Sequence, residues 1–482
     1  METNESLKTA LLQETETTVL KMIEQLQRVS EGDLQELEHS VMSACLSMGQ
    51  RWLETVLNHP RTENRPQARR QGACGHRQRL VGERPKQLLT LMGKVTLRRP
   101  YYQCRLPEGA RETSSCSHGQ APLDEVWGIE TGRSSPGVQK LMSYLGASMT
   151  LEEAAAVFQA VLPLKMSARQ ALNLMQPVGE TLMRREDEQK EWIFQEAAEK
   201  HTASHPKEQK RQEKIRRIYI ELDGVLARMR RGSVLMEEQE KKRPGDVYRE
   251  IKVGAVFTAT QGRNRSELVP GTFVDQAGPI HSVARRTTAE TFGRYLYALA
   301  QGHGIEHARQ VVVLGDGAIW IWRLVAEHFP QAVQIVDLWH AREQVWKVAH
   351  AVFERGSPQE AAWAKQACDL LSEGRIEDLV AEIAALPTVP AEPGSVRSVP
   401  EIEMRYFISN AARMRYPAFR LQGMQIGSGI AEAACKTVVS TRAKRAGMRW
   451  TPDGLDAVLA LRVTVLNGAY SEFWKQRPHL IA

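Results

Sequence analysis

Short strand-like stretches alternate with helical patterns across residues 217–342, and their order limits the fold more than any other feature. Three strands come first, with no helix between them. A helix then opens at Thr287-Thr288-Ala289-Glu290, which has the capping-box form. Two further strands follow, each with a helix after it. The predicted strands cover residues 218–223, 248–258, 280–284, 310–314 and 332–336.

This order of elements is the ribonuclease-H-like topology, in which helices flank a mixed sheet. The fourth predicted strand is apolar without alternation, as is typical of a parallel strand buried on both faces. In this topology the first and fourth strands are neighbours. We therefore predict the α/β class, with a ribonuclease-H-like core that carries an all-α insertion and follows helical and small β-rich regions.

Three acidic residues from distant segments lie at the ends of strands or at the start of a helix. Asp223 ends the first strand and Asp316 follows the fourth, each before a glycine, while Glu432 lies in the first turn of a later helix. Such carboxylates can hold two hard cations about 3.5–4 Å apart, as phosphodiester chemistry requires. The partial positive charge of a helix N-terminus favours ionised Glu432. An isolated Asp-Gly is a common turn, but the combination predicts a catalytic, Mg²⁺-binding triad.

Asp337 and His340 stand at the junction between the fifth strand and its helix. Two interpretations are open. Asp337 could cap the helix while His340 packs inside, because aspartate is a preferred capping residue. Alternatively, both could face the active edge and contact a DNA end or the metal-bound carboxylates.

Basic residues without any acid follow Glu432. Lys436 falls four residues after Glu432, so an ion pair within the helix is one interpretation. A track that contacts DNA phosphates is the alternative that we favour. Trp450 then either stacks on a base or anchors the last helix, and anchoring is favoured because aromatic residues near helices usually belong to the core. The predicted phosphate contacts are Lys436, Arg442, Lys444, Arg445 and Arg449.

The N-terminal third carries the largest local charge. Residues 61–105 contain twelve Lys and Arg residues and two glutamates, so this segment has a net charge of +10, whereas the whole chain has +7. Such a surplus indicates a phosphate-binding surface, although a solvated basic loop is the plain alternative. The residues expected to contact DNA here are Arg69, Arg70, Arg77 and Arg79.

The same region holds residue types suited to structural zinc. Strands are predicted over residues 88–98 and 100–104, and the spacing of the cysteines and histidines is imperfect for a zinc ribbon. Both a zinc site and a metal-free ribbon therefore stay open. The possible zinc ligands are Cys74, Cys104, Cys116 and His118.

The patterns divide the chain into six segments. A capping box at Thr150 to Glu153 and a cap at Ser167 suggest a helix-turn-helix, which simple helix packing would equally explain. The predicted segments are a helical hairpin that could dimerise (1–60), a basic, zinc-ribbon-like module (61–130), a helix-turn-helix-like region with a charged linker (131–216), the first part of the catalytic core (217–342), a helical insertion (343–425) and the C-terminal helices of the core (426–482).

Composition and length point to an ordinary soluble protein. The 482 residues suffice for roughly three domains, and apolar and charged residues make up 42% and 25%. No run of about 18 apolar residues predicts a membrane span, and the polar N-terminus does not read as a secretory signal. Six scattered cysteines indicate reduced thiols, so we expect a cytoplasmic, nucleoid-associated protein.

These motifs together resemble the DDE transposases of bacterial insertion sequences, in particular the ISKra family within the Mutator-like and hAT-like group. The resemblance spans most of the chain. It rests on Leu-Asp-Gly at 222–224, Gly-Asp-Gly-Ala-Ile-Trp at 315–320, Asp-x-x-His at 337–340, Gly-Ser-Gly-Ile-Ala-Glu-Ala-Ala-Cys-Lys at 427–436 and Gly-Met-Arg-Trp at 447–450. The transposases that this chain resembles carry a four-cysteine ribbon near the N-terminus. This sequence departs from that pattern, because Gln71 stands where a first cysteine would pair with Cys74, and Pro107 stands three residues after Cys104.

The resemblance implies a transposase that binds the inverted-repeat ends of its own element. It implies two Mg²⁺ or Mn²⁺ ions on Asp223, Asp316 and Glu432, with DNA cleavage followed by strand transfer. Joining two ends implies at least a homodimer. Two other functions stay open: a catalytically silent, transposase-derived DNA-binding protein, and a structure-selective nuclease of the same fold.

Overall fold

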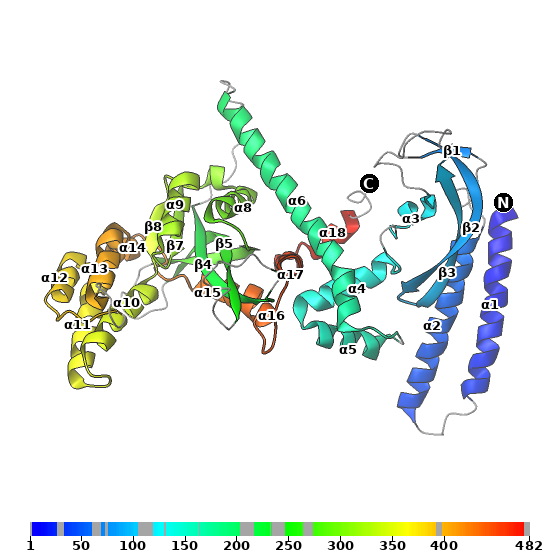
Figure 1. Ribbon diagram of the computed structural model, residues 1–482, viewed down its shortest axis with the longest axis horizontal. Coiled ribbons are helices and arrows are strands. Elements are labelled where there is room, and N and C mark those ends of the chain that lie inside the picture. The colour runs from blue at the N-terminus through cyan, green and yellow to red at the C-terminus, as the bar shows by residue number, and fades with distance from the viewer. Residues whose placement is uncertain are drawn as a thin grey trace. The chain divides into compact units, whose positions relative to one another are not determined.

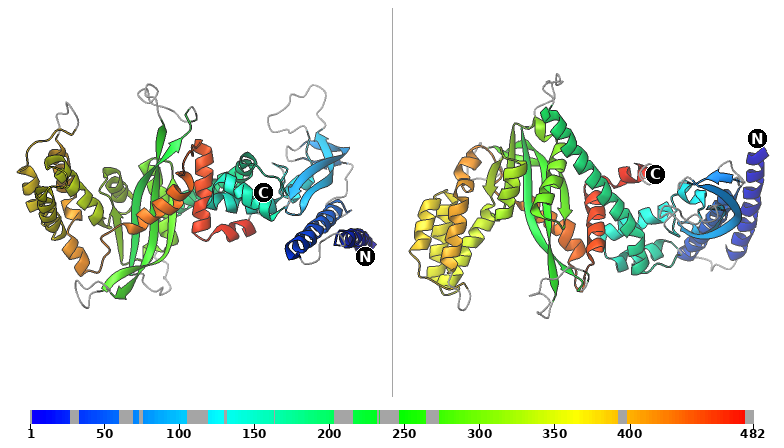
Figure 2. Two further views of the ribbon diagram at one scale, coloured as in Figure 1. Left: turned by 90° about the horizontal axis from the view of Figure 1, so that it is seen from below. Right: turned by 45° about the horizontal axis from the view of Figure 1, so that its top comes forward.

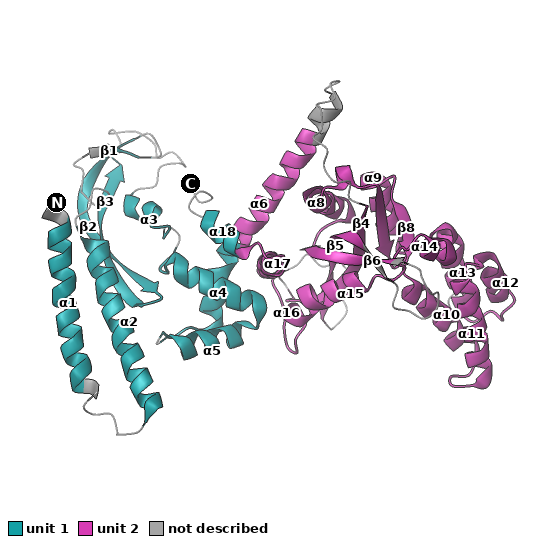
Figure 3. Cartoon of the chain, turned by 180° about the vertical axis from the view of Figure 1, so that it is seen from behind, with its two compact units in different colours: residues 1–178, 471–482 teal, residues 179–470 magenta. Residues whose placement is uncertain are grey.

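The structure is a computed structural model, and its elements are labelled in Figure 1 and seen from two further sides in Figure 2. The chain divides into two compact units, residues 1–178 with 471–482, and residues 179–470 (Figure 3). No helix among the described residues is long and apolar enough to cross a membrane. The structure describes residues 2–26, 33–59, 69–72, 76–104, 119–129, 132–162, 164–202, 216–231, 233, 246–263, 273–391 and 398–476.

The first unit begins with two long helices, α1 (Glu2–Leu26) and α2 (Leu34–Asn58). Asp33 caps α2 by accepting a hydrogen bond from the backbone N–H of Glu36 at 3.1 Å. The helices pack against each other, and Arg51 of α2 forms an ion pair of 3.2 Å with Glu14 of α1. The predicted helical pattern is therefore present as a pair of helices.

A three-stranded antiparallel sheet follows, made of β1 (Arg69–Gln71), β2 (Arg77–Thr90) and β3 (Gly93–Cys104). The prediction of one strand over residues 88–98 is wrong, because a tight turn lies inside that range. The hydroxyl of Thr90 accepts from the N–H of Met92 at 3.2 Å and donates to the carbonyl oxygen of Gly93 at 2.8 Å. Gly93 has a φ of 136°, which a residue with a side chain rarely adopts.

Short helices complete the first unit. The capping box predicted at Thr150 is confirmed, since its side chain accepts from the N–H of Glu153 while that glutamate accepts from the N–H of Thr150. Ser167 accepts from the N–H of Gln170 in the same way at the next helix. The elements are α3 (Pro122–Val126), α4 (Pro136–Ser148), α5 (Leu151–Val161), the start of α6 (Ala168–Thr202) and most of α18 (Tyr470–Gln476).

The second unit is built on a mixed five-stranded sheet with the order β6-β5-β4-β7-β8. β4 pairs with β7 in parallel and with β5 antiparallel, so the prediction that the first and fourth strands are neighbours is confirmed. With helices on both faces, the unit is a mixed α/β structure consistent with a ribonuclease-H-like fold. The strands are β4 (Arg217–Met229), β5 (Val247–Arg263), β6 (Phe273–Arg285), β7 (Gln310–Gly315) and β8 (Val333–Val336).

The first strand is longer than predicted. β4 does not end at Asp223 but continues to Met229, paired with β5 along its whole length. Gly224 does not interrupt the strand, because its backbone is extended and paired with Lys252 of β5. The parallel pairing with β7, however, ends at Glu221 opposite Leu314. Asp223 therefore lies just beyond the point where β4 loses its parallel neighbour.

Helices cover the two faces of the sheet. Gly254 of β5 faces α8 (Ala289–Gly302), because a Cβ there would meet Leu296 and Phe292. Leu222 of β4 is paired with Gly254 and lies on the same face of the sheet. Glu221, the residue before Leu222, therefore points to the opposite face, where it contacts α15 (Gly429–Ala434). Beyond α15 the chain continues as a π-helical segment (Cys435–Ser440), α16 (Thr441–Ala443) and α17 (Pro452–Leu466).

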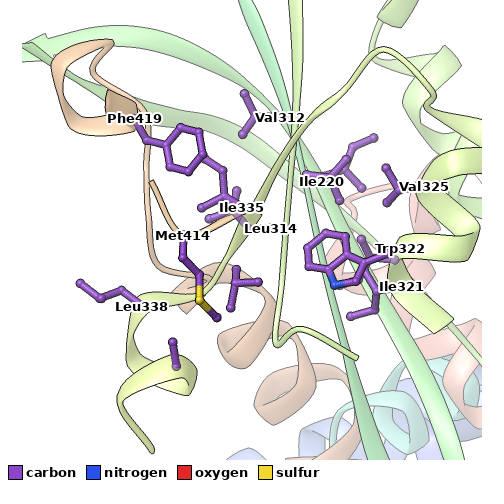
Figure 4. Close-up of a cluster of buried hydrophobic side chains, with 14 of the residues drawn as sticks. Ile220, Val312, Leu314, Ile321, Trp322, Val325, Ile335, Leu338, Met414 and Phe419 are labelled. Carbon is purple, nitrogen blue, oxygen red and sulfur yellow. The ribbon is translucent and has the colours of Figure 1, made fainter. Parts of the chain in front are cut away.

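One hydrophobic core joins the sheet to the insertion. Figure 4 shows Leu314 and Ile335 of two strands beside Met414 and beside Phe419 of α14 (Tyr416–Leu421), while Ile220 of a third strand lies near Trp322 and Val325 of α9 (Ile319–His328). The helices of the insertion gather on one side of the sheet in all views (Figures 1 and 2). They are α10 (Leu338–Val352), α11 (Pro358–Ser372), α12 (Ile376–Ala384), α13 (Val399–Asn410) and α14. α9, which lies between β7 and β8 in the chain, packs beside α8 instead.

The charged helix predicted from residue 184 onward is not wholly exposed to solvent, because several of its charged side chains contact β6 and α8. Glu186 of α6 pairs with Arg285 of β6, and Asp187 accepts a hydrogen bond from the hydroxyl of Tyr295. Lys190, 7% exposed, lies 4.3 Å from the centre of the Tyr295 ring. The charges of this part of α6 thus attach it to the second unit, and residues 203–215 lie outside the described part.

Candidate active site

Asp223 and Asp316 lie on neighbouring strands at the same edge of the sheet. Asp223, half-buried on β4, accepts the N–H of Gly224 at 2.6 Å. Asp316 directly follows β7, and its Oδ1 accepts the N–H of Ala318 at 2.9 Å. Gly317, which lies between Asp316 and Ala318, has a φ of +95°, and this left-handed conformation keeps the turn tight.

The two carboxylates influence each other electrostatically. Burial raises the pKa of Asp316, and the negative charge of Asp223 raises it further. The N–H of Ala318 and the ring of His340 act in the opposite direction. Two like charges held this close favour the binding of a cation between them.

Glu432 comes to this edge from α15. Its side chain is exposed, and its backbone N–H donates to the carbonyl oxygen of Ser428 at 3.1 Å. Cys435, one turn later, is buried, and burial followed by the charge of Asp223 raises the pKa of its thiol, with Glu432 adding to the shift. The thiol of Cys435 therefore senses both carboxylates, which places them on the same side of the sheet.

The donor types at this edge suit a hard cation such as Mg²⁺, because all three are carboxylates. In the described part of the chain, however, no three His, Cys, Asp or Glu side chains converge closely enough to hold a metal ion together. The carboxylates of Asp223 and Asp316 fit a cation in charge and in donor type. The side chain of Glu432 does not lie close enough to them to complete a three-ligand site.

The possible zinc site falls mainly outside the described residues. Cys74, Cys116 and His118 all lie there. Cys104 is the last residue of β3, and its sulfur accepts a hydrogen bond of 3.4 Å from the side-chain nitrogen of Gln78. Zinc binding thus stays a prediction.

Asp337 caps a helix, as the first of the two interpretations expects. It is 3% exposed, and its Oδ1 accepts the N–H of His340 at 2.8 Å at the start of α10. Its Oδ2 accepts hydrogen bonds from the N–H and, at 2.9 Å, the hydroxyl of Ser428. These internal bonds leave Asp337 no surface for the predicted DNA contact. His340, with a side chain 21% exposed, lies near Asp316 and stays a candidate.

The basic track after Glu432 is present in part. Arg442 does not belong to it, because the side chain is 1% exposed and lies 5.1 Å from the centre of the Trp450 ring. Arg449 is exposed and lies 3.5 Å from Asp246. Among the described residues no ion pair joins Lys436 to Glu432. The exposed members of the track are Lys436, Lys444, Arg445 and Arg449.

Trp450 anchors the end of this segment, as favoured from the sequence. It is 7% exposed, and its indole N–H donates to the carbonyl oxygen of Ala443 at 2.9 Å. Its backbone N–H and carbonyl bond to Arg228 and Arg230 at the end of β4. The extension of β4 beyond Asp223 thus supports the basic segment.

In the first unit, the predicted DNA contacts lie on β1 and β2. Arg77 and Arg79 are exposed on β2, and the guanidinium of Arg70 lies 5.5 Å from the centre of the Tyr102 ring. Arg69 pairs with Arg79 through the strand register. These positions leave the arginines of β2 facing solvent.

Two functional candidates were not predicted from the sequence. Glu221, fully buried at 0% exposure, accepts the N–H of Ala431 at 2.8 Å. Burial raises the pKa of Glu221 to about 8, and the charge of Asp337 adds to this. The signal for it was its position two residues before Asp223, which puts both on one face of a strand. Tyr406 of the insertion, which bonds to the backbone of Asp316, had no such signal.

The sequence matches no protein-family model and no curated protein. Among solved structures, the fold is similar to the Drosophila P element transposase strand transfer complex, with 9% sequence identity and a TM-score of 0.23. The match covers 73% of this chain and 83% of that chain. A likeness of this size leaves the function to be argued from the chain's own residues.

Proposed function

We propose that this chain is a DDE transposase of an insertion sequence, which binds the inverted-repeat ends of its element, cuts them and transfers the strands to target DNA. The observation that carries the proposal is the pair Asp223 and Asp316 on neighbouring parallel strands, with Glu432 on a helix of the same side. Carboxylates brought together in this way from distant segments are what two-metal phosphoryl transfer needs.

In the proposed reaction, Asp223, Asp316 and Glu432 hold the metal ions. Bound Mg²⁺ or Mn²⁺ would supply Lewis-acid stabilisation of the attacking and leaving oxygens. The chain's own part is to bind and orient. His340, whose ring lowers the pKa of Asp316, would contact a phosphate or the acidic pair, and Lys436 and the exposed basic residues after it would offer positive charge to the DNA backbone.

Recognition of the ends is assigned to the first unit. Its basic segment carries the largest positive charge of the chain, with Arg70, Arg77 and Arg79 on the strands β1 and β2. Contacts of this kind to phosphates position a protein on DNA, while base contacts supply specificity. Pairing of two ends implies at least a homodimer in the active complex, and the ISKra family is the proposed affiliation.

The test is cleavage of a labelled duplex that carries the element's end, with Mn²⁺, by the full-length protein. The variants Asp316→Asn and Glu432→Gln should bind the duplex as the wild type does and should not cut it. Glu306→Gln, on an exposed residue remote from the carboxylates, is the matched control and should cut normally. Cleavage by Asp316→Asn at the wild-type rate would refute the proposed triad.

A second candidate is a DNA-binding protein of transposase ancestry without catalysis. It is favoured by the finding that no three potential ligands converge in the described part of the chain. This candidate predicts tight, end-specific binding with no cleavage by any variant. Cleavage of branched or unrelated duplexes as readily as the element's end would instead indicate a structure-selective nuclease.

A further inference from the structure

Glu221 is a buried acid for which the proposed chemistry has no use. It lies on β4 two residues before Asp223, and both side chains project from the same face of the sheet. Its side chain is 0% exposed. A buried acidic side chain destabilises the fold unless hydrogen bonds compensate, so an apolar residue would serve the fold better.

The contacts of Glu221 lead to the helix that carries Glu432. Its Oε2 accepts the backbone N–H of Ala431 at 2.8 Å, whereas its Oε1 has no hydrogen-bond partner among the described residues. Ala431 belongs to the first turn of α15 and directly precedes Glu432. One buried bond therefore joins the strand of Asp223 to the backbone beside Glu432.

A second buried carboxylate holds the same turn. Asp337 accepts hydrogen bonds from the N–H and the hydroxyl of Ser428, the residue before α15 begins. Its other oxygen caps α10. The first turn of α15 is thus bound at Ser428 by the residue after β8 and at Ala431 by β4.

α15 needs such support because it has little stability of its own. It is six residues long and passes into a π-helical segment. Helices this short are marginal without tertiary contacts. The Glu432 side chain is exposed, and no other described residue holds it by a hydrogen bond, so its direction follows the backbone that carries it.

We propose that Glu221 is a positioning residue, which fixes the first turn of α15 so that the carboxylate of Glu432 stays on the side of Asp223. The inference rests on the proposed function, because it assigns Glu221 a task within that site. It also makes a structural claim that can be measured without catalysis.

The test uses Glu221→Ala, Glu221→Asp and Glu221→Gln in the full-length protein. Alanine removes the acceptor, aspartate keeps the carboxyl group but shortens the reach to Ala431, and glutamine keeps an acceptor of the same length. Mn²⁺ binding is measured by calorimetry, and hydrogen exchange is followed in the peptide covering residues 428–434. Glu306→Ala is the surface control, and Glu432→Gln is the control for the metal site itself.

Loss of the bond should weaken Mn²⁺ binding by about 10–100-fold in the alanine and aspartate variants, as for other residues that orient a ligand, with glutamine within about threefold of the wild type. Exchange in residues 428–434 should speed up in the same order. The aspartate variant keeps the experiment decisive if alanine prevents folding.

The outcomes separate the two claims. If Glu432→Gln abolishes Mn²⁺ binding while Glu221→Ala and Glu221→Asp bind as the wild type does with unchanged exchange, the role of Glu221 is overturned and the proposed function stands. If the wild type binds no Mn²⁺, the proposed function fails and this inference fails with it.

Discussion

The hydroxyl of Tyr406 donates a hydrogen bond of 2.8 Å to the backbone carbonyl oxygen of Asp316. Tyr406 lies on α13 of the insertion, and Asp316 directly follows β7. Tyr406 is half-buried, and its bond joins the insertion to the backbone of Asp316. The insertion therefore supports the site as well as extending the core.

Replacement of Tyr406 by phenylalanine tests this support. The change keeps the ring and removes only the hydroxyl, so the protein should lose about 1 kcal/mol of unfolding free energy. The cleavage rate should fall because the Asp316 backbone is less constrained, while the affinity for the DNA end stays unchanged. Urea unfolding and single-turnover cleavage measure the two effects. A stability and rate equal to those of the wild type would show that the bond has no role.

Gly317→Ala should be more damaging than Tyr406→Phe. Gly317 has a φ of +95°, and an added Cβ would lie 2.5 Å from the Tyr406 ring. Backbone strain of this kind amounts to about 1–3 kcal/mol, and the clash with the ring adds to it. The double variant with Tyr406→Ala should regain only the part caused by the clash. Full recovery of stability in the double variant would contradict the contribution of the backbone.

The arrangement of the second unit could be predicted from the sequence because each strand carries a strong apolar pattern. The neighbouring positions of Asp223 and Asp316 followed from the order of elements alone, and the structure confirms that β4 and β7 are adjacent. The end of β4 could not be predicted in the same way. Gly224 reads as a turn, yet its backbone is extended and continues the strand, paired with Lys252 of β5.

Side-chain burial was harder to predict than strand order. Arg442 reads as one of five exposed cations, but the fold places it over Trp450 inside the protein. Asp337 reads equally well as a cap or as a DNA contact, and only its bonds to His340 and Ser428 distinguish these interpretations. The burial of Arg442 and the bond between Asp337 and Ser428 both depend on tertiary packing, which periodicity does not report.

Asp223→Asn should raise the stability of the metal-free protein while it removes cleavage. Burial is the main cause of the raised pKa of Asp316, and the negative charge of Asp223 raises it further, so the substitution removes one of two charges that repel each other. In EDTA we expect a melting temperature higher by roughly 1–3 °C. Thermal unfolding measures it, and Glu306→Gln should show no change.

Addition of Mn²⁺ should make the wild type more stable to heat than the Asp223→Asn variant, the reverse of their order in EDTA. Mn²⁺ at about 100 times its dissociation constant stabilises a protein that binds it by about 2.7 kcal/mol. The wild type should gain this stability, and Asp223→Asn should gain little. Equal Mn²⁺-induced shifts in both proteins would place the metal elsewhere.

Arg462 should govern the π-helical segment after Glu432. Its guanidinium donates from Nε at 2.9 Å and from Nη2 at 2.7 Å to the carbonyl oxygen of Thr437. Arg462→Met removes both bonds and should allow the segment to take the tighter α-helical form, which rotates Lys436 relative to Glu432. We expect weaker DNA binding at low salt and slower cleavage. Arg462→Lys, which can still donate one bond, should retain most of both, and identical losses in the two variants would argue against the carbonyl contact.

Acid should destabilise the second unit through a pair of histidines. Nδ1 of His281 on β6 and Nε2 of His303 at the end of α8 lie 2.8 Å apart. Burial lowers the pKa of His303, and the positive charge of His281 lowers it further. Below about pH 6.5 the unfolded chain therefore binds a proton at His303 more readily than the folded chain does. The stability that neutral His303 contributes is complete above that pH and is lost as the pH falls.

His303→Gln should reduce that dependence. We expect the difference in urea midpoint between about pH 7.5 and pH 5 to be smaller in the variant than in the wild type. The pKa of His328 is also lowered, chiefly by burial, but that residue is present in both proteins, so the comparison isolates His303. A variant with the same acid sensitivity as the wild type would show that the histidine pair is protonated without cost to the fold.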